Sequence, residues 1–222
     1  CLRRALLLTE QAPELAPSVL AASAELDAAR PELGVDDARR SLLRAHLELA
    51  EQANPAFRTQ LVLRAAQFAS EALQDDRAGF DVLRGGAAVP PFPEPLLDAL
   101  EHAAVRINRL DALDAQLARS AERSDAIHDK QRLLTRRARV LTERLSRYDQ
   151  AAQVYERLLE LAPHDADAAS LQLACLRKAG RHRELLRACE RQLSQVPDAQ
   201  SKLALMREMA QIWEVELKNR AS

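Results

Sequence analysis

Apolar residues recur at spacings of three and four along this chain, and proline, glycine or aspartate interrupts them at short intervals. The spacing is plain in Met206, Met209, Ile212 and Trp213. Residues spaced in this way share one face of an amphipathic helix, so the pattern predicts an all-α fold of antiparallel helices. The expected helices are Leu2–Gln11, Glu14–Arg30, one from Asp36 or Asp37 to Ala53, Pro55–Leu73, a short one from Arg77, Glu94–Ile107, Leu110–Arg123, His128–Leu145, Tyr148–Leu161, Asp165–Ala179, His182–Gln195 and Ala199–Asn219.

The pattern returns after a step of 72 residues, from near Leu61 to the end of the chain. A shorter step of 34 residues separates Pro163 from Pro197. Self-similarity at such steps is typical of stacked-repeat architectures. Under the longer shift these residues coincide: Ala66, Ala138 and Ala210; Phe68, Val140 and Ile212; Leu73, Leu145 and Leu217; Gly79 and Ala151; Pro91 and Pro163.

Within the repeat, the run Arg147-Tyr148-Asp149-Gln150-Ala151 is followed by an aromatic residue at Tyr155 and by Pro163. These marks resemble the second helix and the closing proline of the tetratricopeptide repeat (TPR). The first helix matches at Ala138 only if one extra residue is allowed before the turn, at Leu145. The resemblance implies a right-handed α-α superhelix of TPR-like hairpins, in which small residues such as Ala138 and Ala151 let two helices cross closely.

The repeats are expected to form one continuous solenoid over residues 1–222, cut from a longer array. Residues 1–56 carry the period faintly, 57–127 form a degenerate repeat pair, 128–199 form the best pair, and 200–222 form the first helix of a further repeat. Because this last helix has no partner within the chain, the pattern predicts self-association through its bare apolar side.

A Pro-rich break is expected at residues 85–95. Two glycines at 85 and 86 weaken a helix, and prolines at 90, 91, 93 and 95 are excluded from helix interiors. Since the register resumes without an insertion, the simplest interpretation is an extended segment in place of a helix. A ligand for an SH3-like partner is the alternative, although the segment lacks a flanking basic anchor set.

The charge and composition of the chain restrict the kinds of partner that it is expected to bind. The net charge is −1 with 29% charged residues, whereas proteins that bind nucleic acid usually carry a basic surplus. The sequence therefore argues against a nucleic-acid partner. For the same reason it argues against the interpretation of the chain as an RNA-binding helical repeat. No apolar run is long enough for a membrane span, so no membrane insertion is expected. Arginine far outnumbers lysine, which favours a GC-rich bacterial source; the compartment is unknown, with the cytoplasm favoured and the periplasm left open.

Catalytic, cofactor and metal sites are not expected. The chain contains no Gly-rich phosphate loop, nucleophile elbow, HExxH or CxxC. The thiols of Cys175 and Cys189 are expected to be buried and unbridged, and a metal site with His182 between them is the weaker alternative. Cys1 is interpreted as a fragment boundary, the alternative being the lipid-bearing cysteine of a lipoprotein.

The resemblance also implies where a ligand would lie, because first helices line the concave groove of a TPR array. The candidate groove residues are Gln67, Ser70, Arg132, Arg139, Glu143, Arg177 and Gln211. Arginine offers a forked donor for carboxylates, although arginines that only pair with neighbouring acids are the competing interpretation. The expected function is a non-enzymatic scaffold that docks a peptide or protein partner. The alternative is a ligand-sensing or regulatory module attached to an effector domain.

Overall fold

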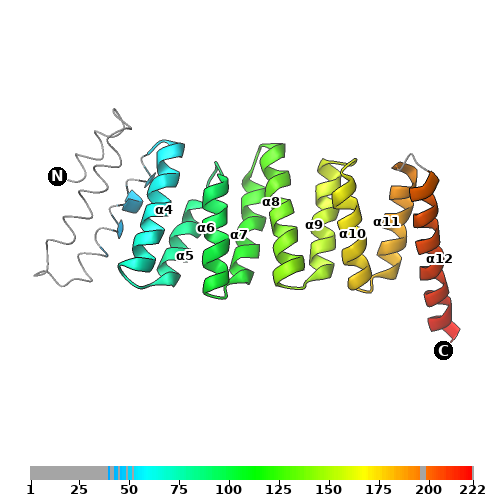
Figure 1. Cartoon of the computed structure of the whole chain (residues 1–222). Helices are drawn as coiled ribbons and strands as arrows, with labels where there is room; N and C mark the ends of the chain where they lie inside the picture. The colour runs from blue at the N-terminus through cyan, green and yellow to red at the C-terminus, as the bar shows by residue number, and fades with distance from the viewer. Residues whose placement is uncertain are drawn as a thin grey trace, which may run out of the picture. The chain divides into compact units, whose positions relative to one another are not determined.

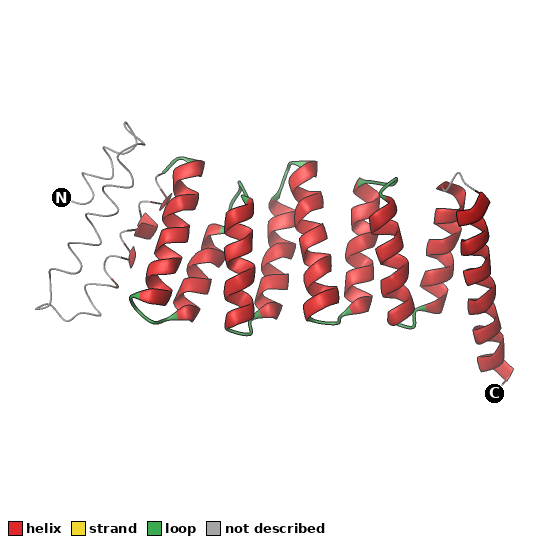
Figure 2. Ribbon diagram, viewed as in Figure 1, coloured by secondary structure: helices red, strands yellow, loops and turns green. Residues whose placement is uncertain are grey.

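The structure is a computed structural model that describes residues 40, 43–44, 46–48, 50–51, 53–195 and 199–221. The helices expected within residues 1–30, and the start of the next one, lie outside this part of the chain. Every regular element in the described part is a helix, and it contains no strand (Figures 1 and 2). The predicted all-α class is therefore confirmed, and its stacked hairpins are those of an α-α superhelix.

The chain divides into two compact units, Cys1–Gln116 and Leu117–Ser222. In each unit, consecutive helices pack as hairpins, α4 against α5 in the first and α8 against α9 in the second. The single continuous solenoid stays a prediction. The first unit contains α4 (Pro55–Glu71), α5 (Asp76–Gly86), α6 (Glu94–Arg106) and the start of α7 (Leu110–Arg123). The second contains the end of α7, α8 (Ile127–Arg139), η2 (Val140–Arg144), α9 (Tyr148–Leu161), α10 (Ala166–Lys178), α11 (His182–Gln195) and α12 (Ala199–Ala221).

Several helices begin at side chains that cap them. The side-chain oxygen of Asn54 accepts a hydrogen bond from Phe57 N at 3.0 Å, and Pro55 takes the first helical position of α4. Asp75 caps α5 through Ala78 N, and Asp165 caps α10 through Ala168 N, both at 2.9 Å. Each cap gives an acceptor to an otherwise unpaired helix-end donor, which explains why α10 begins where the sequence predicts.

Small residues mark the crossing of the two helices in a hairpin. In α5, a Cβ added at Gly79 would lie 2.6 Å from Ser70 Oγ and 3.0 Å from Ala66 O, so even an alanine there would force Ser70 or the helix to shift. The residues 72 positions after Ala66 and Gly79 are Ala138 and Ala151, and both are 0% exposed. The small-residue marks of the sequence repeat therefore lie at the closely packed positions of both hairpins.

The break in the Pro-rich segment is shorter than expected. Helix α5 continues through Gly85 and ends at Gly86, so these glycines do not stop it earlier. A Cβ at Gly86 would lie only 2.5 Å from Val62 Cγ1 of α4, so glycine is required there for close packing rather than for a break. The irregular segment is fixed at Ala87, whose carbonyl accepts from the buried Gln116 Nε2 at 2.9 Å, and at Phe92, which is 1% exposed. The burial of Phe92 removes the middle of the proline run from any SH3-like partner.

Four helices in the described part of the chain are followed by a residue with positive φ, namely Gln74, Asn108, Ser146 and Gly180, with φ between 52° and 68°. Gln74 to Ser146 and Asn108 to Gly180 are each 72 residues apart. At Gly180 the following N–H, from Arg181, bonds to Leu176 O at 3.0 Å, and at Asn108 the N–H of Arg109 bonds to Ala104 O at 2.8 Å. These bonds are those of the Schellman motif. The sequence repeat is thus present in the backbone.

The ends at Gln74 and Ser146 contain one more residue than the Schellman motif. Here Asp75 N bonds to Ala69 O at 3.0 Å, and Arg147 N bonds to Leu141 O at 2.8 Å. In the second unit, the extra residue opens the last turn of the first helix into the π-helical segment η2. A π-helical turn is one residue inserted into an α-helix. It accounts for the extra residue that the TPR resemblance required at Leu145, and it replaces the end of the expected helix His128–Leu145.

No helix in the described part of the chain is both long enough and apolar enough to cross a membrane.

Candidate functional site

A cleft of about 530 Å³ lies between α10 and α12 of the second unit. Most of its lining side chains are small: three alanines and Ser170 from α10 face Ser201 and Ala204 from α12, and Leu173 and Leu205 supply apolar surface. The lining residues are Pro163, His164, Asp165, Ala166, Ala169, Ser170, Leu173, Ala174, Arg177, Gln192, Ser201, Ala204, Leu205 and Glu208. The space exists because the side chains that line it are short. We refer to it as the α10/α12 cleft.

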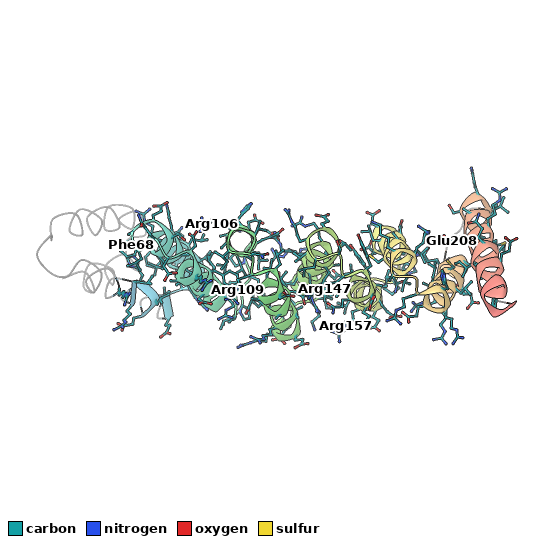
Figure 3. The ribbon with its side chains drawn as sticks, turned by 90° about the horizontal axis from the view of Figure 1, so that it is seen from below. Phe68, Arg106, Arg109, Arg147, Arg157 and Glu208 are labelled. Carbon is teal, nitrogen blue, oxygen red and sulfur yellow. The ribbon has the colours of Figure 1, made fainter. Side chains whose placement is uncertain are left out.

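One edge of the α10/α12 cleft carries an ion pair. Arg177 of α10 donates through Nε and Nη2 to Oε1 of Glu208 on α12, with Nε 3.0 Å from the oxygen. Glu208 is labelled on α12 in Figure 3. The side chain of Arg177 is 58% exposed and that of Glu208 is 21% exposed, so solvent screens the pair. Arg177 is one of the predicted groove residues, and it is the one that lines this cleft.

The remaining predicted groove residues do not join Arg177 in the cleft. Gln67 and Ser70 belong to the first unit. Gln67 Nε2 donates to Glu71 Oε1 at 2.9 Å, and Ser70 Oγ accepts from Arg106 Nη2 at 3.0 Å. Arg106 (Figure 3) also pairs with Asp76 at 2.8 Å, so Ser70 is part of a contact that links α4, α5 and α6.

In the second unit, Arg132 pairs with Asp129 of its own helix at 2.9 Å. Arg139 at the end of α8 and Glu143 within η2 are both exposed, and Gln211 is exposed on α12 beyond the cleft. A shared groove over all seven predicted residues stays a prediction.

Sequence reasoning missed the small residues that form the cleft. On α10, Ala166, Ser170, Leu173, Ala174 and Arg177 follow one another at spacings of three, four or one, which places them on one helix face. On α12, Ser201, Ala204, Leu205 and Glu208 repeat the same spacing. A search for two consecutive first helices with a stripe of small residues would have found both walls.

A second, larger cleft lies on the other side of the same unit, between α9 and α11. It measures about 750 Å³, and most of its lining residues are polar or charged. Arg191 of α11 pairs with Glu156 of α9 at 2.9 Å across it. Its lining residues are Ala152, Gln153, Glu156, Gln172, Leu176, Glu184, Arg187, Glu190, Arg191 and Ser194. We refer to this space as the α9/α11 cleft.

The thiols of the second unit are shielded from reaction. Cys175 is 4% exposed and Cys189 is 0% exposed, and neither is bridged. Burial raises the pKa of the Cys175 thiol, and burial together with the Glu208 charge raises the pKa of Cys189 to about 11. Since the thiolate is the reactive form, these groups are poor nucleophiles at neutral pH. Among the described residues, no group of three or more His, Cys, Asp or Glu could hold a metal ion, and Cys175, His182 and Cys189 are not such a group.

No family model and no curated protein matches the chain. Among solved structures, the chain is similar to MamA of AMB-1, with 21% sequence identity over 76% of this chain and 94% of that chain. At a TM-score of 0.41 the two backbones agree only loosely. The repeated hairpins and the repeated helix ends define the chain as a helical-repeat protein.

Proposed function

We propose that this protein is a non-enzymatic, tetratricopeptide-like scaffold that docks an extended peptide segment of a partner in the α10/α12 cleft. The observation that carries the proposal is the cleft itself, about 530 Å³ of open space between two first helices. Ligand sites commonly have volumes of roughly 300–1,000 Å³, with apolar walls and a few polar groups that fix orientation. The small side chains provide room, and Arg177 with Glu208 provides the charged edge.

The chemistry of the cleft favours binding over catalysis. His164 lies just before the N-cap of α10 and Arg177 near the end of that helix, and Arg177 is already paired with Glu208. A general acid–base pair or an activated nucleophile needs its groups within hydrogen-bond reach of each other. The walls supply mainly methyl and hydroxyl groups, which contact a ligand without reacting with it. A peptide with an apolar side chain between two backbone amides fits such walls.

The test is a selection of peptides from a random library on the immobilised protein, followed by fluorescence anisotropy. Ala204→Phe would fill the cleft, and we expect it to weaken the selected peptides at least tenfold. Ala115→Phe makes the same change at an exposed position of α7 that does not line the cleft, and should leave the dissociation constant within twofold. Thermal unfolding of both variants checks that they fold. Peptides that bind Ala204→Phe as well as the unaltered protein would overturn the proposal.

A further inference from the structure

A small cavity lies where α9, α10 and α11 meet, next to the α9/α11 cleft. Its volume is about 120 Å³, and its walls include the short side chains of Ala169 and Ala188. Its other lining residues are Glu156, Leu159, Glu160, Pro163, Gln172, Arg191 and Gln192. We call this space the glutamine slot, after Gln172 of α10 and Gln192 of α11. It shares Pro163, Ala169 and Gln192 with the lining of the α10/α12 cleft, so a peptide docked in that cleft can also contact Gln192, whereas Gln172 lines the slot and not that cleft.

Both glutamine amides of the slot lack a partner among the described residues. Gln192 Nε2 is buried and has no hydrogen-bond partner in this part of the chain. Gln172 is 3% exposed, and its side chain makes no hydrogen bond with the other described residues. Buried amide groups in folded proteins nearly always have a partner, because leaving one unpaired forfeits its interactions with water. Gln192 Nε2 is such an atom, and its position at the same cavity as the Gln172 amide indicates that a further molecule completes the hydrogen bonds there.

The slot is reached from the larger cleft outside it. Glu156, Gln172 and Arg191 line both spaces. The Arg191–Glu156 pair, at 2.9 Å, therefore lies at the mouth. The outer cleft is about 750 Å³, far larger than the group the slot itself can hold. A ligand can thus place one small polar group in the slot while the chain that carries it lies across α9 and α11.

The charges at the slot select a neutral group. The Arg191 charge is matched by Glu156, which leaves Glu160 as the further charged group of the lining. An incoming carboxylate would meet like charge, and an apolar group would leave both glutamine amides unpaired. A primary carboxamide has two donors and an acceptor, which complement the acceptor and donors of a second amide. We propose that the glutamine slot binds the side-chain amide of an asparagine or glutamine on a polypeptide partner.

The experiment follows the side-chain amide signals of Gln172 and Gln192 by NMR in ¹⁵N-labelled protein. The probes are N-acetyl N-methylamide derivatives of glutamine, glutamate and leucine. We expect saturable shifts of both amides with the glutamine probe, at least tenfold tighter than with the other two. Gln192→Met keeps the length of the side chain and removes its amide, and it should weaken the glutamine probe at least tenfold. Gln153→Met, on the outer cleft wall, should change binding less than twofold.

Gln172→Met is the second variant, because Gln172 does not line the α10/α12 cleft and its loss therefore tests the slot alone. Equal binding of the three probes, or unchanged binding to both methionine variants, would overturn the proposal. The proposal would also be overturned if the Gln172 and Gln192 amides contacted only water and their signals did not move with any probe, because the slot would then be a hydration site.

Discussion

At the scale of single residues, the hairpins depend on positions where nothing larger than a methyl group fits. Ala138 and Ala151 are both 0% exposed, and their counterparts in the first unit are Ala66 and Gly79. Sequence comparison at the 72-residue shift was enough to find these positions, because a close crossing tolerates few residue types. It could not find Gly86, whose need for glycine comes from Val62 of a different helix at 2.5 Å.

We expect Ala151→Leu to lower the free energy of unfolding by about 1–3 kcal/mol, because overpacking a filled crossing forces neighbouring helices apart. Urea denaturation followed by circular dichroism measures the change. Gln153→Leu is the matched control, since it adds a similar side chain at an exposed position of the same helix, and it should stay within about 0.5 kcal/mol. A midpoint that is equal for Ala151→Leu and the unaltered protein would contradict the close crossing.

The buried thiol of Cys189 predicts a loss of stability in alkali. Its pKa is about 11 in the folded protein against 9.0 for an exposed thiol, so the unfolded chain releases its proton first. Stability from this group is complete below pH 9 and falls as the pH rises through 11, by roughly 1–3 kcal/mol. Urea midpoints between pH 8 and 11 test this. Cys189→Ala should be less stable at pH 8 but show a shallower fall, and an equal slope in both proteins would refute the assignment.

At the scale of elements, the sequence predicts the helices well and their ends less well. Expected and observed bounds of α9 and α11 coincide, because their apolar stripes and turn residues are local signals. Helix α5 extends through Gly85 and Gly86 since contacts with α4 outweigh the low helix propensity of glycine. Most of the groove prediction stays untested. The pairing of Arg177 with Glu208, 31 residues away, depends on how α12 packs, which spacing along one helix does not specify.

Ser146 and Gly180 both have a positive φ after a helix, 53° and 68°, although their helix ends are of different kinds. A left-handed conformation costs a residue with a side chain about 1 kcal/mol relative to glycine. We therefore expect Ser146→Gly to raise the free energy of unfolding by about 0.5–1 kcal/mol and Gly180→Ala to lower it by about 1 kcal/mol. Chemical denaturation of the pair measures both. If both substitutions changed the free energy of unfolding in the same direction, backbone conformation would not be what determines the stability of these helix ends.

At the scale of the whole molecule, α12 leaves an apolar stripe uncovered. Leu203, Met206 and Trp213 are 47%, 52% and 51% exposed, and their spacing places them on one side of the helix. Leu205 and Ile212 are buried at 8% and 7% exposure. A contiguous exposed stripe of this kind favours association between copies of the chain.

We expect the protein to associate reversibly as its concentration rises, and Leu203→Glu to shift that association to at least tenfold higher concentration. Light scattering across a concentration series gives the measurement. Leu171→Glu makes the same change at a 46% exposed leucine of α10 and should have little effect. A protein that stays monomeric at high concentration would refute the prediction for α12.

The alternation of helix ends also bears on the history of the gene. The described part of each compact unit contains one helix end with the extra residue, followed by one Schellman end: Gln74 then Asn108, and Ser146 then Gly180. A copying event that duplicated a single hairpin would have produced ends of one kind. Two kinds in this order are what the duplication of a cassette of two unlike hairpins would produce. In such a lineage, an insertion or deletion of one whole cassette keeps the order of the two kinds of helix end, so the turns need not be rebuilt.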